Sequence, residues 1–202
     1  MCLWAKGENG TATVVRIVLA SASPRRREFL EKLGLVFETV APKLDETRLD
    51  AEDPQIYVER LARAKALAGA GEGIISIGAD TAVVAAGEVL GKPKDAEDTM
   101  RMLRLLSGEW HTVITAVCVT SSPEVLEVIS VKTQVKFAPM SPGQLEWLAK
   151  SGDGDDKAGA YAIQGLAGAF VERIEGSVSN VVGLPLAETL RLLHEAGAEL
   201  PW

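Results

Sequence analysis

The segment that most constrains the fold lies near the N-terminus, where an apolar strand pattern runs directly into a helix start. Residues 14–20 read VVRIVLA, which is β-branched and apolar enough for a buried strand. Ser23 is a preferred N-cap residue and Pro24 suits the first helical position, while the apolar stripe that follows ends at Gly34. The segment therefore predicts a strand, a tight turn and a helix.

The first turn of this helix carries three arginines, Arg25 to Arg27, although the helix macrodipole favours acidic side chains there. Each cation opposes the dipole by roughly 0.3–1 kcal/mol, and the free backbone N–H groups of the turn already favour an anion. A phosphorylated ligand would balance the charge of the arginines and accept hydrogen bonds from these N–H groups. The alternative interpretation is a well-capped helix whose arginines are only solvated.

Beyond this unit, short apolar runs alternate with helical patterns, which indicates an α/β fold. Two long β-rich runs, 111–120 and 125–137, are separated by a Ser-Ser-Pro turn and predict an antiparallel pair, so that the sheet is mixed. Further helices are expected over residues 53–70, 95–107, 141–150 and 185–197, and further strands over residues 36–40, 74–77, 161–164, 170–174 and 178–182.

The composition predicts a compact protein without a broad basic surface. Of the 202 residues 47% are hydrophobic, and 21 Lys and Arg accompany 28 Asp and Glu, for a net charge of −7. This balance argues against nucleic acid as a partner and confines any basic site to a local one. The two cysteines, Cys2 and Cys118, are too few for a thiolate metal site or a disulfide framework.

The sequence also lacks the patterns of a membrane or secreted protein. No stretch approaches the roughly 20 apolar residues of a membrane span, and residues 1–13 lack the apolar core of a signal peptide. We therefore expect a cytoplasmic protein without a membrane partner. Residues 1–13 are expected to be a flexible lead-in to a single α/β domain over residues 14–202.

A candidate catalytic carboxylate follows the apolar run at residues 74–77. Asp80 and Thr81 are predicted to lie just past the end of that strand, where open α/β sheets expose side chains to a ligand crevice. A hydrogen-bonded turn made by the same two side chains is the structural alternative.

A lysine lies in a loop that resembles a phosphate-binding loop without matching it. Residues 87–93 lack one intervening residue of the Walker A pattern, and Pro93 replaces its Mg²⁺-binding Ser or Thr. Lys92 is still a candidate phosphate ligand on a rigid Gly/Pro turn. An ordinary hairpin exit with a solvated lysine is the alternative.

Loop carboxylates are the remaining candidate ligands. Oxygen ligands of this kind suit Mg²⁺, although acidic loops are also common as solvated faces; they are Asp45, Glu46, Asp153, Asp155 and Asp156. His111 and His194 lack the neighbours of a catalytic triad or zinc site and are interpreted as structural. Anion ligands and carboxylates without a covalent nucleophile fit metal-assisted attack of water on a phosphoanhydride.

Six collinear motifs resemble those of the Maf family of nucleoside triphosphate pyrophosphatases. They are SASPRR at 21–26, GADT at 78–81, GKP at 91–93, LSG at 106–108, DKAGAYAIQG at 156–165 and VGLP at 182–185. The resemblance runs in order from about Ile17 to Leu193. The fifth motif resembles the branch that acts on dTTP and UTP rather than on 7-methyl-GTP, although Ala162 stands where that branch usually has glycine.

The resemblance implies a fold and an activity. The fold is α/β and similar to inosine triphosphate pyrophosphatase, with a mixed twisted sheet flanked by helices and two lobes around a cleft, in a homodimer. The activity is hydrolysis of dTTP and UTP, or of modified pyrimidine nucleotides, to the monophosphate and pyrophosphate with a divalent metal, Mg²⁺ or Mn²⁺. A nucleotide-binding regulator of septum formation without turnover is the alternative.

The resemblance also implies roles for individual residues. Asp80 would accept a proton, with Lys65 and Lys92 as further catalytic residues. The metal would lie on Asp45, Glu46 and Asp80, and whether Asp80 is base or metal ligand is left open. Substrate binding would fall to Ser21, Arg25, Arg26, Thr81, Lys157 and Gln164, of which Arg25, Thr81 and Gln164 occupy positions associated with substrate choice.

Overall fold

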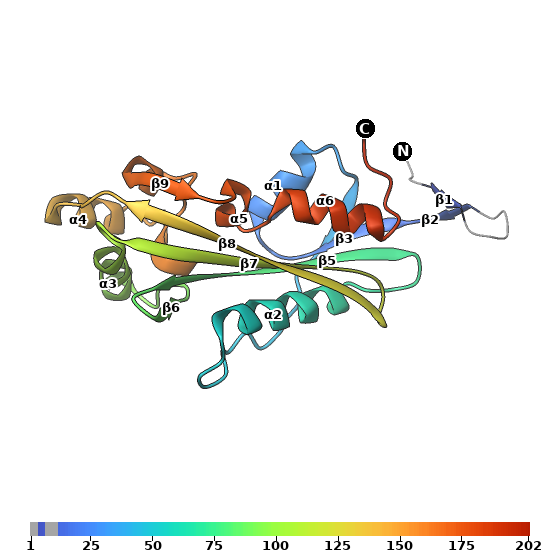
Figure 1. Cartoon of the computed structure of the whole chain (residues 1–202), viewed down its shortest axis with the longest axis horizontal. Helices are drawn as coiled ribbons and strands as arrows, with labels where there is room; N and C mark the ends of the chain where they lie inside the picture. Colours follow the sequence, from blue (N-terminus) through green and yellow to red (C-terminus); the bar gives the residue numbers. More distant parts are fainter. Residues whose placement is uncertain (1–3, 7–11) are drawn as a thin grey trace. The chain divides into compact units, whose positions relative to one another are not determined.

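The computed structural model describes residues 4–6 and 12–202 of the chain (Figure 1). The elements in chain order are β1 (Trp4–Lys6), β2 (Ala12–Val14), β3 (Arg16–Ala20), α1 (Pro24–Lys32), β4 (Phe37–Val40), α2 (Pro54–Ala68), β5 (Ile74–Ala85), β6 (Glu88–Leu90), α3 (Ala96–Leu106), β7 (Trp110–Ser122), β8 (Val125–Phe137), α4 (Pro142–Lys150), the 3₁₀ helices η1 (Ala158–Ala160) and η2 (Leu166–Phe170), β9 (Val171–Glu175), α5 (Val178–Val182) and α6 (Leu186–Glu195).

Seven strands form one mixed sheet in the order β4-β3-β5-β7-β8-β9, with β6 beside β5. Strand β3 runs parallel to β4 and β5, whereas β6 is antiparallel to β5 and β9 is antiparallel to β8. Strands β7 and β8 are neighbours joined by Pro123 and Glu124 alone, a connection short enough only for an antiparallel hairpin. The predicted fold class, a mixed α/β sheet with helices, is confirmed.

The chain divides into two compact units. Unit 1 comprises Met1–Asp80, Ala116–Ser130 and Gly183–Trp202, and unit 2 comprises Thr81–Thr115 and Val131–Val182. The division falls within β5, β7 and β8, each of which contributes residues to both units. The expectation of two lobes agrees with this division, whereas a cleft and a single domain over residues 14–202 stay predictions.

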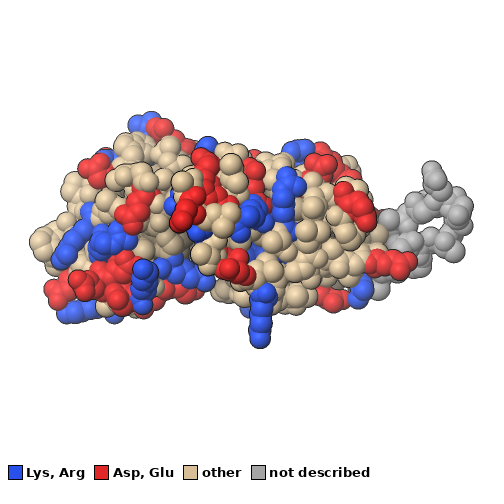
Figure 2. Space-filling view, turned by 90° about the horizontal axis from the view of Figure 1, so that it is seen from below, with Lys and Arg blue, Asp and Glu red and all other residues tan. Residues whose placement is uncertain are grey.

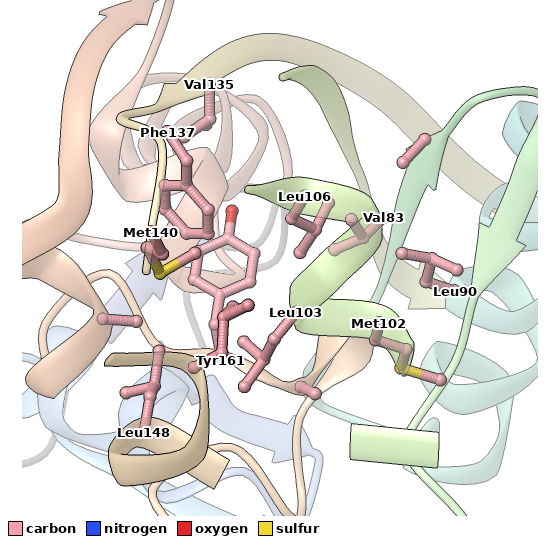
Figure 3. Packing of buried hydrophobic residues seen from close by; sticks show 14 of the residues in the cluster. Val83, Leu90, Met102, Leu103, Leu106, Val135, Phe137, Met140, Leu148 and Tyr161 are labelled. Atoms are coloured by element: carbon pink, nitrogen blue, oxygen red, sulfur yellow. The ribbon is translucent and has the colours of Figure 1, made fainter. Parts of the chain in front are cut away.

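Each unit has its own apolar core. In unit 1, α1 and α6 lie on one face of β3 and β5, and α2 lies on the other (Figure 1). The core on the α1 and α6 side includes Ile17, Leu19, Leu30, Ile75, Ile77, Leu192 and Leu193. The core of unit 2 is drawn in Figure 3 and includes Val83, Leu90, Leu103, Leu106, Val135, Phe137, Leu148 and Tyr161.

The helix starts follow their local capping signals. The Asp53 carboxylate accepts hydrogen bonds from the N–H groups of Gln55 and Ile56 at the start of α2. At the start of α4, Ser141 and Gln144 form the predicted capping box. These signals are local in sequence, which is why the predicted starts of α1, α2, α3, α4 and α6 are confirmed.

The strand that carries Asp80 is longer than predicted. Residues 78–81 have a turn-like composition, so the strand was expected to end at Ile77, but β5 continues to Ala85 and places Asp80 inside it. A β-carbon at Gly78 would lie 2.2 Å from the Ala62 carbonyl oxygen and 2.3 Å from the Ala66 nitrogen. Gly78 therefore permits the close approach of α2 to β5 instead of forming a turn.

Two further strand predictions are wrong. Residues 161–164 form irregular structure and a turn after η1, and Val178–Val182 forms helix α5. In α5 the buried Asn180 side chain donates from Nδ2 to the Val113 carbonyl and to Thr133 Oγ1. These tertiary hydrogen bonds override the β propensity of the surrounding valines. The strand expected over residues 170–174 is confirmed as β9.

The N-terminal segment is described in part. Strands β1 and β2 pair antiparallel, with Trp4 opposite Val14. Residues 1–3 and 7–11 of the expected flexible lead-in lie outside the described residues, so its flexibility stays a prediction. Among the described residues, no helix has the length and apolar character needed to cross a membrane. Basic and acidic side chains are interleaved over the face shown in Figure 2.

We expect Gly78→Ala to lower the free energy of unfolding by about 1–3 kcal/mol, because the added methyl group would meet backbone atoms of α2. Urea unfolding measures this change. Gly143→Ala is the control, since a β-carbon there has nothing within 4 Å and lies in the first turn of α4. The control should leave stability unchanged or raise it. Equal stability of Gly78→Ala and the unaltered protein would contradict the close packing of β5 and α2.

Candidate active site

Three charged side chains of unit 1 meet at the ammonium group of Lys65. Its Nζ lies 2.7 Å from Asp80 Oδ1 and 2.7 Å from Glu46 Oε1. Lys65 belongs to α2, Asp80 to β5, and Glu46 to the loop before α2. The side chains of Lys65 and Asp80 are each 10% exposed, whereas that of Glu46 is 48% exposed. One ammonium group therefore joins a buried and a half-exposed carboxylate.

The packing of α2 on β5 produces this geometry. Side chains alternate along a strand, so Asp80 lies on the same face of β5 as Gly78. That face meets α2 between Ala62 and Ala66, the turn of the helix that contains Lys65. Because Gly78 has no side chain, the helix comes close enough for Lys65 to reach Asp80.

The surroundings of Asp80 make it a better proton acceptor than an exposed aspartate. Burial raises the pKa of Asp80 above its usual value, the charges of Lys65 and Arg26 oppose this rise, and the Glu46 carboxylate adds to it. A carboxylate with a raised pKa takes a proton more readily, while the ammonium partner favours its ionised form before the reaction.

Arg26 lies buried beside this group. Its Nε donates to the Gly183 carbonyl at 2.7 Å, and its Nη1 donates to the Ala79 carbonyl at 2.8 Å and to Ser21 Oγ at 3.2 Å. Burial lowers the pKa of Arg26, and the Asp80 charge opposes this shift. These hydrogen bonds hold the backbone next to Asp80, so Arg26 serves to position the site in addition to any contact with a ligand.

The arginine-bearing turn of α1 keeps its predicted position. Ser23 is the N-cap residue and Pro24 is in the first turn, but within the described residues the Ser23 side chain makes no capping hydrogen bond. The Ser23 N–H instead donates to Ser21 Oγ at 3.2 Å. Arg25 is partly exposed, so its guanidinium group stays the predicted phosphate ligand of this turn.

The predicted metal ligands separate into two kinds. Asp45 Oδ1 accepts from the Thr47 N–H at 2.9 Å. Hydrogen bonds from the side chain and then from the backbone of Thr47 lower the Asp45 pKa, so Asp45 shapes a turn. Glu46 and Asp80 both lie at Lys65. Within the described part of the chain there is no group of three or more His, Cys, Asp or Glu side chains that could hold a metal. Two carboxylates nevertheless fit Mg²⁺, which commonly binds one or two carboxylates together with substrate phosphates.

In unit 2, the Thr81 hydroxyl group belongs to a chain of hydrogen bonds with buried polar groups. Thr81 Oγ1 lies 3.0 Å from Thr115 Oγ1, and Thr115 Oγ1 donates to the Asn180 carbonyl at 2.9 Å. A hydroxyl group has one proton, and Thr115 uses its proton on Asn180. Thr81 is therefore the donor to Thr115.

Two of the sequence motifs meet in unit 2. The Gly159 N–H donates to the Gly91 carbonyl at 3.1 Å, which brings the loops of Lys92 and Lys157 together. Lys92 is exposed. Lys157 Nζ donates to the Asp153 carbonyl and to the Asp156 carboxylate. The two predicted phosphate ligands thus share one region of unit 2.

Asp153 organises the loop that carries Gln164. Its Oδ2 accepts from the Leu166 N–H at 3.0 Å, and a β-carbon on Gly165 would lie 2.1 Å from the same oxygen. The carboxylate therefore packs against the loop backbone. This is a structural role, whereas the sequence had suggested Asp153 as a candidate metal ligand. Gln164 is exposed on this loop.

His111 is a core residue of unit 2. Its Nε2 lies 2.8 Å from Tyr161 Oη, and its ring meets those of Phe137 and Tyr161 edge to face. Burial lowers the His111 pKa to about 4, which keeps the ring neutral. His194 lies exposed in the last turn of α6.

The sequence did not reveal the residues that hydrogen-bond to the predicted site residues and their loops. Thr115 lies in an apolar run and gives no signal of its own. Asn180 was assigned to a strand, although asparagine is depleted in strands, and this mismatch is the signal that could have found it. Tyr57 and Arg60 lie within the helix expected over residues 53–70 and gave no further signal, whereas in the structure both are hydrogen-bonded to the loop of Glu46.

Comparisons with known proteins agree with the motifs. The family model described as "Maf-like protein" matches residues 16–196, a span that contains all six motifs. A dTTP/UTP pyrophosphatase of Anaeromyxobacter dehalogenans (strain 2CP-1 / ATCC BAA-258) is 55% identical over 190 residues, which cover 93% of this chain and 97% of that protein. A dTTP/UTP pyrophosphatase of Vibrio cholerae serotype O1 is 51% identical over 187 residues, covering 91% and 99%.

Solved structures were also compared. A HAM1 protein from Coxiella burnetii matches with a TM-score of 0.44 and 15% identity, covering 68% of this chain and 98% of that chain. The family assignment rests on the sequence matches, which extend over nearly the whole length of both partners. The chain belongs to the Maf family.

Proposed function

We propose that this chain is a nucleoside triphosphate pyrophosphatase that hydrolyses dTTP and UTP to the nucleoside monophosphate and pyrophosphate. The observation that carries the proposal is the buried Asp80 carboxylate of the GADT motif, paired with Lys65. The names of the Anaeromyxobacter and Vibrio relatives, which match over nearly the full chain, support the pyrimidine substrates.

The reaction needs a proton acceptor beside the attacking water. The water oxygen forms a bond to the α-phosphorus, and the bond from that phosphorus to the bridging oxygen breaks, so that pyrophosphate leaves with the electron pair. Asp80 accepts the proton of the water, because burial has raised its pKa while Lys65 favours its ionised form. Lys65 donates to Oδ1, so Oδ2 is the oxygen of Asp80 that serves the reaction, either as proton acceptor or as metal ligand.

Cationic and polar side chains bind the triphosphate and the base. In unit 1, Arg25 is a phosphate ligand, and Ser21 and Arg26 support the turn that carries it. In unit 2, Lys92 and Lys157 are the phosphate ligands. The amide of Gln164 reads the pyrimidine edge, because it offers both a donor and an acceptor.

Glu46 and Asp80 would hold a divalent metal, Mg²⁺ or Mn²⁺, and the ion would supply charge neutralisation on the phosphates. The proposed enzyme is a homodimer, as the family resemblance implies, and its proposed location is the cytoplasm.

The orientation of the Thr81 hydroxyl group bears on the choice of base. Thr115 directs its own proton to the Asn180 carbonyl and accepts the proton of Thr81, which fixes the orientation of the Thr81 hydroxyl group. Uracil and thymine carry a donor at N3, whereas cytosine carries an acceptor there. A hydroxyl group fixed in contact with this edge of the base distinguishes the two, so Thr81 contributes to the choice of UTP and dTTP over CTP.

The first test is product analysis with Mg²⁺ and a panel of dTTP, UTP, CTP, ATP, GTP and 7-methyl-GTP, with ion-exchange separation. We expect monophosphate and pyrophosphate, formed fastest from dTTP or UTP. Diphosphate with phosphate would place the attack at another phosphorus. Nucleotide that is bound but left intact across the panel would favour the regulator without turnover.

We expect Asp80→Asn to lower kcat by about 10²- to 10⁴-fold, the usual contribution of a general base. The variant should fold, because Glu46 still pairs with Lys65; circular dichroism checks this. Asp50→Asn, at an exposed carboxylate of the loop before α2, is the matched control and should keep full activity. Full activity of Asp80→Asn would remove Asp80 from the mechanism.

Thr115→Val should reduce the preference for UTP over CTP by about two- to tenfold, which corresponds to the roughly 0.5–1.5 kcal/mol of one hydrogen bond. The valine removes the acceptor of the Thr81 proton, so the Thr81 hydroxyl group is no longer held in one orientation. The ratio of the two kcat/KM values measures the effect. Thr120→Val, at another buried threonine of β7, controls for lost stability and should leave the ratio unchanged. An unchanged ratio in Thr115→Val would refute the assignment.

A further inference from the structure

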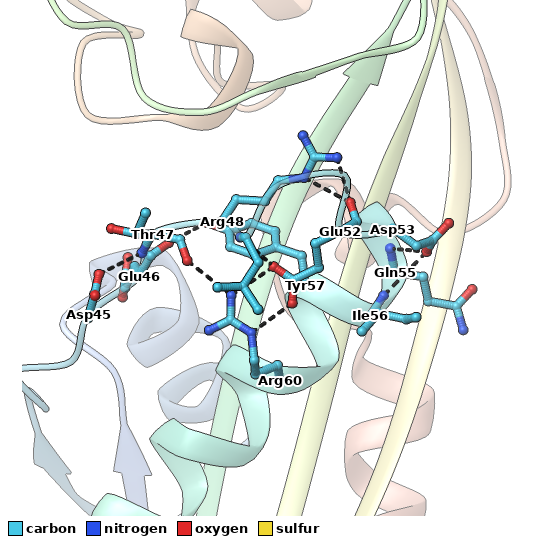
Figure 4. Close-up of polar contacts among 11 residues, drawn as sticks. Asp45, Glu46, Thr47, Arg48, Glu52, Asp53, Gln55, Ile56, Tyr57 and Arg60 are labelled. Carbon is cyan, nitrogen blue, oxygen red and sulfur yellow. Dashed lines mark hydrogen bonds and ion pairs between the residues drawn. The ribbon is translucent and has the colours of Figure 1, made fainter.

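The loop that carries Glu46 is fastened to the first half of α2 by hydrogen bonds, drawn in Figure 4. All of the residues involved belong to unit 1. We call the set the clasp, and it consists of Asp45, Thr47, Arg48, Glu52, Tyr57 and Arg60. Within the described contacts none of these residues is hydrogen-bonded to the Lys65 ammonium, and Tyr57 is hydrogen-bonded to the backbone of Glu46.

The strongest contact of the clasp is the bidentate pair of Arg60 with Glu52. Arg60 Nε lies 2.7 Å from Glu52 Oε1, and Arg60 Nη2 lies 2.8 Å from Glu52 Oε2. Only 5% of the Glu52 side chain is exposed, and the hydrogen bond from Arg60 lowers the Glu52 pKa to about 2. Glu52 is therefore ionised at any working pH, and the fork geometry fixes its orientation.

The same two residues fasten the loop backbone. Arg60 Nη2 also donates to the Thr47 carbonyl at 3.1 Å, and the Leu49 N–H donates to Glu52 Oε2 at 3.0 Å. Arg48 donates through Nε, at 3.0 Å, and through Nη2 to the Glu52 carbonyl. The segment from Thr47 to Glu52 is thereby closed on itself and on α2.

Tyr57 and Asp45 hold the backbone at Glu46. Tyr57 Oη donates to the Glu46 carbonyl at 3.0 Å, and Asp45 Oδ1 accepts from the Thr47 N–H at 2.9 Å. Burial raises the Tyr57 pKa to about 12, so its hydroxyl group stays a donor. The Arg60 guanidinium lies 5.7 Å from the Tyr57 ring centre, which links the two anchors.

We propose that the clasp holds Glu46 on Lys65 for the reaction, with Tyr57 and Arg60 as positioning residues. The ion pair with Lys65 holds only the end of the Glu46 side chain, which is 48% exposed, whereas the hydrogen bond from Tyr57 holds the Glu46 backbone. Glu46 also lies outside regular secondary structure. The backbone contacts of the clasp supply the order that the ion pair lacks.

This inference rests on the proposed function, in which Glu46 and Asp80 together hold a divalent ion. Loss of a group that orients a metal ligand typically lowers metal affinity or activity by about 10- to 100-fold. The clasp therefore predicts an effect on the second carboxylate alone, while the Asp80–Lys65 pair stays in place.

The test is Tyr57→Phe, which removes one hydroxyl group. We expect kcat for dTTP to fall by about 10- to 100-fold and the half-saturating Mg²⁺ concentration to rise by a similar factor, with KM for the nucleotide little changed. Arg60→Met should act in the same way, and Arg60→Lys should recover part of the loss. Arg63→Met, at an exposed arginine of the same helix, is the matched control and should match the unaltered protein.

A double-mutant cycle separates positioning from a general structural effect. If Tyr57 acts through Glu46, Tyr57→Phe should cause little further loss in a Glu46→Gln background. Equal losses in both backgrounds, or a Tyr57→Phe variant with normal kcat and normal Mg²⁺ dependence, would overturn the inference.

Calorimetric titration of Mn²⁺ into each variant gives a readout that does not depend on turnover. Weaker Mn²⁺ binding by Tyr57→Phe than by Arg63→Met supports the clasp, and equal binding refutes it. Should the unaltered protein hydrolyse no nucleotide, the proposed function fails while this titration still decides the inference.

Discussion

The ion pair of Lys65 with Asp80 imposes conditions on the residues around it. Both side chains are almost fully buried, and buried charges are tolerated only where partners and hydrogen bonds replace the lost water. The pair lies at the meeting point of α2 and β5, so its length of 2.7 Å depends on how closely that helix packs on that strand. Gly78 meets this condition, because any side chain there would push the helix away.

The charges near the pair also have to balance. Arg26 contributes a second buried cation, which the Asp80 charge favours and which two carbonyl groups and Ser21 orient. Glu46 contributes a second anion to Lys65 from the more exposed side. Two cations and two anions thus share one region of unit 1, which allows Asp80 to be both desolvated and ionised. A lone buried aspartate would lose its charge.

The sequence predicted the parts of this arrangement whose causes are local. Helix starts at Pro54 and Pro142 depend on neighbouring caps, and the motif of Asp80 is contiguous. It did not predict the length of β5. Gly78 has the composition of a turn, but its small size allows packing against α2, which is distant in sequence. The sequence also did not predict α5, where the tertiary hydrogen bonds of Asn180 outweigh local propensity. The contacts of Lys65 with Glu46 and Asp80 were not predicted for the same reason, because tertiary packing brings these residues together.

The two carboxylates at Lys65 are held by different means, and this difference has a physical consequence. Asp80 is fixed by the strand that carries it and by burial, so its position is determined once the core of unit 1 has formed. Glu46 is fixed by contacts of a loop, and those contacts converge on Glu52 and Arg60. Glu52 is buried and paired, so opening the loop would expose Arg60 and leave a carboxylate without its partner. The order of the loop is therefore set by a charge pair outside the site, and the half-exposed Glu46 takes its position from it. In the function proposed above, a carboxylate that the core fixes and a second carboxylate that a loop presents would suit a metal that arrives bound to the phosphates of its substrate.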